Sequence, residues 1–156
     1  VDVSKDKKRI VVTDYKTGSP YSYQKMNKDP LDAGRRLQLP IYALAAKRSL
    51  VETEQAQGSY WFVTVAANYE RKVVDLGQIE DRFNEVIESI STGIQNGLFP
   101  ANPGPPGRFG PENCTYCDFD RLCPAARASL WDRKKGDIRL APYTGLSESP
   151  DDEEDE

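Results

Sequence analysis

Asp14 and Lys16 are the residues whose types and spacing first indicate chemistry. They lie at the end of a β-branched run that predicts a strand over residues 9–15, followed by a turn. Side chains on a strand alternate between faces, so the carboxylate and the ammonium share one face and Tyr15 points to the other. Such a pair can hold a divalent cation and the water that it activates, or it can be a solvated ion pair on a surface strand.

Gln38 and Tyr42 form a second polar pair. A helix is expected over about residues 30–50, with Asp29 as its N-cap, and positions four apart share a helix face. Pro40 lies inside this range and predicts either a kink or a later start of the helix. Because polar groups on the inner side of a helix need partners, the two side chains either line a site or satisfy each other.

Cys114, Cys117 and Cys123 follow a segment rich in proline and glycine and have the spacing C-x2-C-x5-C, which indicates a soft-metal site. Zinc would need a fourth ligand, and with no histidine present Asp118 or Asp120 would have to serve. An iron–sulfur cluster also needs four cysteines, so its fourth would come from outside this chain. Three free buried cysteines are the remaining alternative.

The composition limits the chemistry further. The 156 residues suffice for one domain with a core, and the absence of histidine excludes Ser–His and Cys–His catalysis by this chain alone. The net charge of −4 is uneven, because seven acids lie in the last ten residues and leave 21 basic against 18 acidic residues elsewhere. This balance is compatible with a polyanionic ligand. The tail, residues 136–156, is expected to be disordered from about residue 147.

Further elements are expected from hydrophobic period and turn residues. A polar loop over residues 17–29 mixes aromatic and basic side chains, which can meet nucleic acid or belong to an ordinary loop. The other expected elements are strands at 1–4, 59–66 and 71–76 and helices at 78–96 and 124–134.

The location of the protein follows from what the sequence lacks. No apolar run approaches the roughly 18 residues of a membrane span, and no signal peptide is visible. An odd number of cysteines without a secretory signal favours a reducing compartment. We therefore expect a cytoplasmic location and no membrane partner.

Together these motifs resemble a known family. The stretch Val11–Gly18, the Q-x-x-x-Y motif within Leu37–Ala45 and the cysteine triplet closely resemble, in this order, the RecB/AddB branch of the PD-(D/E)XK nuclease superfamily. The resemblance covers about residues 1–130. It implies an α/β, restriction-endonuclease-like fold with a mixed central sheet flanked by helices, and a nuclease domain over residues 1–135 that includes the cysteine segment 113–124.

The resemblance also implies roles for the matching residues. Asp14 would be a metal-binding carboxylate, and the backbone carbonyl of Tyr15 a further ligand of Mg²⁺ or Mn²⁺. Lys16 would position the attacking water and offset charge on the phosphate. Gln38 and Tyr42 would flank the site and orient Lys16 and the DNA backbone. The three cysteines would be three of the four ligands of a 4Fe–4S cluster.

The implied function is that of a metal-dependent DNA exonuclease that hydrolyses phosphodiester bonds. Its partners would be DNA and a helicase domain or subunit, in a helicase–nuclease of double-strand break repair and recombination. One alternative is a non-catalytic, DNA-binding iron–sulfur scaffold with a degenerate nuclease fold. Another is a nuclease of the CRISPR-adaptation type, which shares the motif order.

One part of the family pattern is incomplete here. The family's other metal-binding acid lies on the preceding strand, in a pattern like G-x-(I/V)-D-R-(I/V)-D. This chain starts without a methionine at what resembles the end of that pattern, with Asp2 in the place of its second Asp. If the hairpin turn centres between Asp6 and Lys7, Asp2 faces Val11 and lies on the opposite sheet face from Asp14. We therefore expect one metal-binding acid to be missing and little or no activity from this chain alone.

Overall fold

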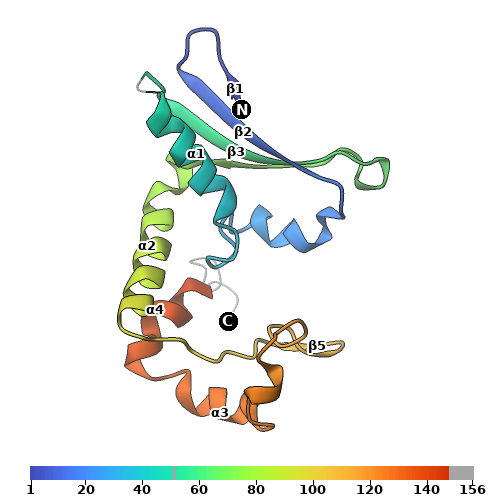
Figure 1. Cartoon of the computed structure of the whole chain (residues 1–156), viewed down its shortest axis with the longest axis vertical. Coiled ribbons are helices and arrows are strands. Elements are labelled where there is room, and N and C mark those ends of the chain that lie inside the picture. The colour runs from blue at the N-terminus through green and yellow to red at the C-terminus, as the bar shows by residue number, and fades with distance from the viewer. Residues whose placement is uncertain (51, 148–156) are drawn as a thin grey trace, which may run out of the picture. The chain divides into compact units, whose positions relative to one another are not determined.

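The structure, a computed structural model, describes residues 1–50 and 52–147. The described chain forms two compact units, the first from Val1 to Glu88 and the second beginning at Ser89 (Figure 1). The acidic residues beyond position 147, for which disorder is expected, lie outside the described residues. None of the described helices combines the length and the apolar character that crossing a membrane requires.

A four-stranded mixed sheet forms the centre of the first unit. The strands are β1 (Asp2–Val3), β2 (Arg9–Lys16), β3 (Gln55–Phe62) and β4 (Arg71–Asp75), and their order in the sheet is β1-β2-β3-β4. The pairing of β2 with β3 is parallel and the other two pairings are antiparallel. A parallel pair needs a crossover connection, which here contains the helix α1 (Gln38–Ser49). The α/β fold class predicted from the sequence, a mixed sheet flanked by helices, is confirmed.

The helix α1 begins eight residues later than the expected start at residue 30. Asp29 does accept the backbone N–H groups of Leu31 (3.0 Å) and Ala33 (2.6 Å), as a cap would. However, the three successive residues Asp32–Gly34 have positive φ (46°, 53° and 84°), which ends the turn before a helix can form. Pro40 therefore falls in the first turn of α1, where its missing N–H leaves no intrahelical bond unmade.

The strand β3 also differs from its predicted range, since it both begins and ends about four residues earlier. The β-branched residues after Phe62 favour a strand by propensity, but the side chain of Thr64 accepts the N–H of Ala67 and caps the short 3-10 helix η2 (Val65–Ala67). Asn68 then adopts the left-handed conformation (φ 50°) that leads the chain back into β4. Local capping overrides strand propensity here.

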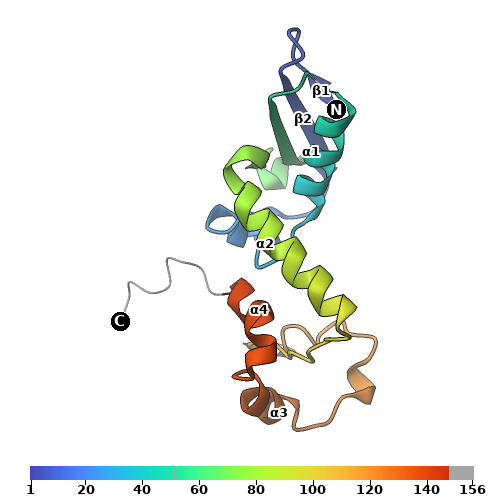
Figure 2. The same ribbon diagram turned by 90° about the vertical axis from the view of Figure 1, so that its left-hand side faces the viewer.

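One face of the sheet, which we call the inner face, is covered by α1 (Figure 2). Ala43 of the helix packs with Ile10 of β2 and Ala56 of β3 in the core. Along β3, helix and strand approach most closely at Gly58: a Cβ atom at this position would lie 2.7 Å from Leu39 Cβ and 2.9 Å from Leu39 O. The absence of a side chain at Gly58 thus sets the distance between α1 and the sheet.

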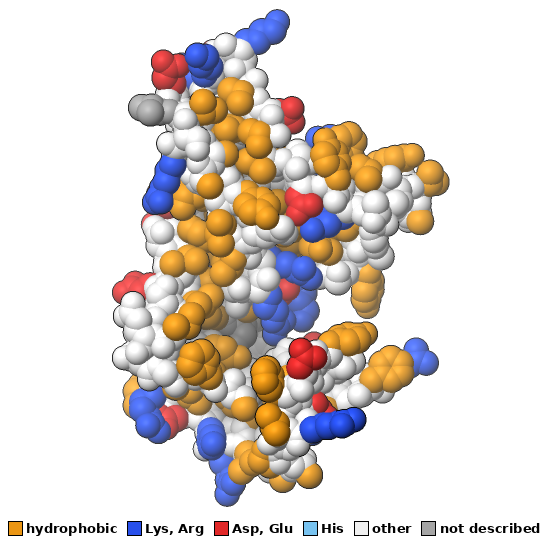
Figure 3. All heavy atoms as spheres, in the orientation of Figure 1, with side chains coloured by type: hydrophobic (Ala, Val, Ile, Leu, Met, Phe, Trp, Pro, Cys, Tyr) orange, Lys and Arg blue, Asp and Glu red, His pale blue; other side chains and the backbone are white. Residues whose placement is uncertain are grey.

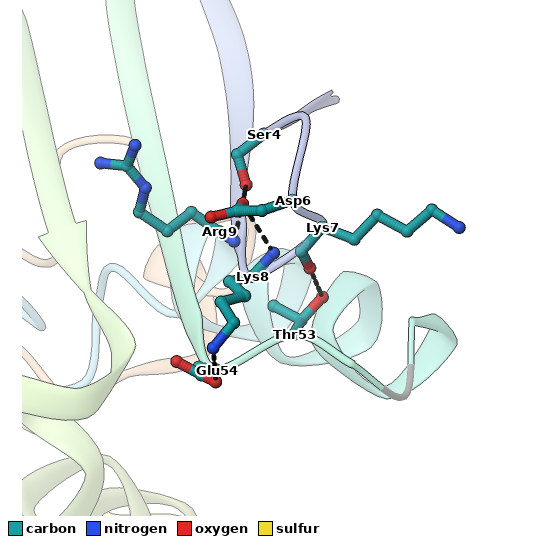
Figure 4. A network of polar contacts seen from close by, with 7 residues as sticks. All are labelled: Ser4, Asp6, Lys7, Lys8, Arg9, Thr53 and Glu54. Atoms are coloured by element: carbon teal, nitrogen blue, oxygen red, sulfur yellow. Dashed lines mark hydrogen bonds and ion pairs between the residues drawn. The ribbon is translucent and has the colours of Figure 1, made fainter.

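A network of polar contacts holds the β1–β2 turn at one end of the sheet (Figure 4). Ser4 Oγ donates to Asp6 Oδ1 (2.5 Å) and accepts the N–H of Arg9 (3.0 Å), and this hydroxyl holds the pKa of Asp6 below its usual value. Lys8 Nζ forms an ion pair with Glu54 Oε1 (2.7 Å), which ties the turn to the start of β3. These contacts fix the register of β1 on β2.

The remaining elements follow β4. The helix α2 (Leu76–Gln95) agrees with the predicted helix, and its apolar stripe is buried at Ile79, Phe83 and Val86. In the second unit the segment before the cysteines forms a small hairpin of two-residue strands, which the sequence did not predict. The elements described there are β5 (Pro106–Gly107), β6 (Gly110–Pro111), α3 (Arg127–Lys134) and α4 (Ala141–Thr144).

We predict that Gly58→Ala destabilises the protein by about 1–3 kcal/mol, because the added methyl group overlaps Leu39 and α1 must shift outward. Urea unfolding measures the change. Gly18→Ala is the matched control, since a Cβ at Gly18 meets nothing within 4 Å and its stability should change little. Equal stability of the two variants would show that α1 does not depend on this close approach.

Candidate active site

Asp14 and Lys16 both point to the inner face at the end of β2. Their side chains are 20% and 26% exposed, and Lys16 Nζ lies 3.0 Å from Asp14 Oδ2. Asp14 pairs with Tyr60 of β3, and Tyr60 pairs with Lys72 of β4, so one row of the sheet places all three side chains on the inner face. The predicted alternation is confirmed, because Tyr15 lies on the other face and is 60% exposed.

Gln38 and Tyr42 project together from the first turns of α1, as their spacing predicts. Gln38 Nε2 donates to Tyr42 OH (3.1 Å), and Gln38 Oε1 accepts from Tyr60 OH (3.2 Å). Lys16 Nζ lies 4.9 Å from the centroid of the Tyr60 ring. Tyr60 therefore connects the helix pair to the strand pair, and the four predicted site residues come together around it.

Tyr60 is the residue that sequence reasoning missed. It is only 2% exposed. Burial, with the nearby Tyr23 hydroxyl and Asp14 carboxylate, raises the pKa of Tyr60 to about 12. Its hydroxyl is therefore protonated at neutral pH and can donate to Gln38. The alternation of side chains along the strand places Tyr60 on the same face as Phe62, and this pattern is visible in the sequence. Its pairing with Asp14 depends on the register between β2 and β3, which no local pattern determines.

The loop after β2 is anchored to this row. It forms a 3-10 helix, η1 (Pro20–Asn27), where the sequence predicted only a polar loop. The ring of Tyr23 contacts the ring of Tyr60 edge to face, with centroids 5.0 Å apart. The guanidinium carbon of Arg36 lies 4.1 Å from the centroid of the Tyr23 ring. Lys72 Nζ donates to Asn27 Oδ1 (2.7 Å) from the sheet.

Asp2, the candidate for a second carboxylate beside Asp14, does not lie at the site. Asp2 pairs with Val11, so it lies on the face opposite Asp14, and the register is the one that a turn between Asp6 and Lys7 predicts. Within the described ranges, no three His, Cys, Asp or Glu side chains form a group that could hold a metal ion. Asp14 thus presents a hard carboxylate oxygen of the kind that Mg²⁺ prefers, without two further such side chains beside it among the described residues.

Comparison with known proteins bears on this arrangement. The family model described as the PD-(D/E)XK nuclease superfamily matches residues 1–124, which include the whole sheet, α1 and the cysteine triplet. The chain belongs to the PD-(D/E)XK nuclease superfamily. No curated protein and no solved structure matches it significantly. Membership makes this a nuclease fold of the kind that generally works with divalent metal ions, and Asp14 and Lys16 occupy its inner-face strand.

The cysteine segment of this nuclease-superfamily chain lies in the second unit. Cys114, Cys117 and Cys123 are each half-buried and line a single cavity of about 760 Å³, whose walls include Phe99 and Trp131. Consecutive turns bring the three thiols to this wall. They do not form a group that could hold a single metal ion among the described residues.

Arg127 also lines the cysteine cavity. It forms an ion pair with Asp120. Its contact with the Asp120 carboxylate and its hydrogen bond with Cys114 raise the pKa of Arg127 above its usual value. Asp120 is engaged with Arg127, and neither Asp118 nor Asp120 completes a metal-binding group with the cysteines among the described residues. The cavity instead presents three soft sulfur ligands beside a permanent positive charge.

Proposed function

We propose that this chain is part of the catalytic domain of a metal-dependent DNA exonuclease of the RecB/AddB-like branch. It would act in a helicase–nuclease of double-strand break repair, with a helicase domain or subunit as its partner. The observation that carries the proposal is the inner-face cluster, in which Tyr60 brings the Asp14–Lys16 pair of β2 together with the Gln38–Tyr42 pair of α1.

Phosphodiester hydrolysis requires attack of a water oxygen on phosphorus, loss of the water proton and cleavage of a phosphorus–oxygen bond on the opposite side. A divalent cation, Mg²⁺ or Mn²⁺, held by Asp14 and the carbonyl of Tyr15 would supply positive charge and an acidic water. The ammonium of Lys16 would hold the attacking water and offset the charge that develops on the phosphate oxygens. These roles need no histidine.

Gln38 and Tyr42 would act as positioning residues in this proposal. Gln38 is held by hydrogen bonds on both sides, from Tyr60 and to Tyr42. Tyr42 is 44% exposed at the edge of the cluster, so it can also meet a DNA backbone. Through Tyr60, the pair would help to orient Lys16, which lies 4.9 Å from the centroid of the Tyr60 ring, and the strand being cut.

In this proposal the chain lacks the second metal-binding acid of the site, since Asp2 lies on the face opposite Asp14. We accordingly propose that this chain alone cleaves DNA weakly or not at all. A scaffold that only binds DNA is the second candidate, and the observation in its favour is that, within the described ranges, no three His, Cys, Asp or Glu side chains form a group that could hold a metal ion. A nuclease of the CRISPR-adaptation type would use the same cluster without a helicase partner.

We predict that, in the longer protein that supplies the second acid, Asp14→Asn and Lys16→Ala each lower Mg²⁺-dependent DNA cleavage by about 10²–10³-fold, since each removes a charge that stabilises the transition state. Cleavage of labelled DNA with and without EDTA measures this. Asp2→Asn is the control and should leave the rate unchanged, because Asp2 lies on the opposite face.

Two results would contradict this proposal. An equal loss of cleavage rate in Asp2→Asn and Asp14→Asn would show that the metal is not held at Asp14 on the inner face. Tight DNA binding by the longer protein without any metal-dependent cleavage would instead support the scaffold.

We further propose that the three cysteines bind a 4Fe–4S cluster whose fourth cysteine lies outside this chain. The support is the shared cavity with its three thiols and the neighbouring Arg127, whose charge would partly balance an anionic cluster. We predict that the longer protein purified without oxygen is brown and contains iron and sulfide, and that Cys117→Ser removes the colour. A colourless, zinc-loaded protein would exclude the cluster.

A further inference from the structure

The 3-10 helix η1 presents a basic and aromatic surface beside the inner-face cluster. Residues three apart align on a 3-10 helix, so Tyr23 and Met26 share one line, which faces the protein: Met26 is 7% exposed and Tyr23 is half-buried. The other two lines face solvent. One of them carries Tyr21, which is 84% exposed, and the other carries Lys25 and ends at Lys28, the C-cap of η1. We call Tyr21, Lys25 and Lys28 the η1 ridge.

The ridge is held in place by contacts with the site itself. Tyr23 packs on Tyr60 and on Phe62, with ring centroids 5.0 and 5.2 Å away. Asn27 accepts a hydrogen bond from the 8%-exposed Lys72, which belongs to the same row as Asp14 and Tyr60. The ridge is therefore a fixed neighbour of the Asp14 row.

The charge on this segment has one sign. No acidic residue occurs between Asp14 and Asp29, while three lysines do. In the part of the chain that the structure describes, neither Lys25 nor Lys28 forms an ion pair with an acid. Figure 3 shows Lys and Arg side chains gathered where Figure 1 draws this segment, and others at the β1–β2 turn at the top of the view. A polyanion would find two uncompensated lysines at the ridge.

We propose that the η1 ridge holds the single strand of DNA that enters the site, with a base stacked on Tyr21 and phosphates on Lys25 and Lys28. An exposed aromatic ring beside lysines is the arrangement that single-strand binding uses, because every unpaired base has a face to stack. In a duplex the base faces are covered, and only the lysines would contribute. This inference rests on the proposed function and names how its substrate is held.

Binding can be measured on this chain itself, in EDTA, so that cleavage plays no part. The probes are a fluorescent oligothymidylate, an abasic strand of the same length and a hairpin duplex. Fluorescence anisotropy measures the affinity for each probe over a series of salt concentrations. The ridge variants are Lys25→Ala/Lys28→Ala, Tyr21→Ala and Tyr21→Phe. The control is Lys5→Ala/Arg48→Ala, which removes the same charge near the β1–β2 turn and at the end of α1, at the opposite end of β2 from η1 (Figure 1).

We expect Lys25→Ala/Lys28→Ala to reduce the slope of log affinity against log salt by about 1.4, which corresponds to two phosphate contacts on a single strand. Tyr21→Ala should weaken binding of oligothymidylate by about tenfold but leave binding of the abasic strand unchanged, and Tyr21→Phe should retain stacking. The Lys5/Arg48 control should bind as the wild type does. Loss of bases in the probe matters only to a ring that stacks, so a merely structural role of Tyr21 would not give this pattern.

The two proposals fail in different ways. If the wild type binds the single strand and every ridge variant behaves as the control does, the ridge proposal is wrong and the proposed nuclease function stands. If tight binding is seen only with the duplex, the ridge is not a single-strand platform. If the wild type binds none of the probes, the DNA substrate of the proposed function is wrong, and the ridge proposal falls with it.

Discussion

The parallel pairing of β2 with β3 is the constraint on which the candidate site depends. It sets Asp14 opposite Tyr60, and a shift by one residue would turn Tyr60 to the outer face and separate α1 from the strand pair. Through Tyr60 the same register positions Gln38, by a hydrogen bond, and Lys16, which lies 4.9 Å from the ring. An acid and a lysine that could have formed a surface ion pair become part of a polar cluster in this way.

The helix α1 is the second half of that constraint. Gly58 allows its backbone to come within a distance that no side chain would permit, and Gln38, at the start of the helix, then reaches Tyr60. The helix can start at this point because the positive φ angles of Asp32–Gly34 stop an earlier one and because Pro40 fits a first turn. Backbone strain and a small residue, rather than a long-range charge, position the polar pair.

The sequence predicts the elements that local pattern determines and misses those that depend on tertiary contact. The strand β2, the helix α2 and the opposite-face position of Asp2 follow from side-chain period and turn geometry, and the structure confirms them. The pairing of Tyr60 with Asp14 joins residues far apart in sequence, so no local pattern reveals it. The polar sequence of residues 17–29 predicts a loop, but the structure has the 3-10 helix η1 there, where Tyr23 packs on Tyr60 of the sheet.

Whether Asp14 binds a divalent metal is the central question, and paramagnetic broadening by Mn²⁺ in amide NMR spectra of this chain tests it most directly. On the proposed function, we predict that low Mn²⁺ concentrations broaden first the signals of residues 14–17 and of Tyr60, their neighbour across the sheet, and that Asp14→Asn removes this selectivity while Asp2→Asn does not. Broadening that is centred elsewhere, or that survives in Asp14→Asn, would contradict the assignment of the metal to the inner face.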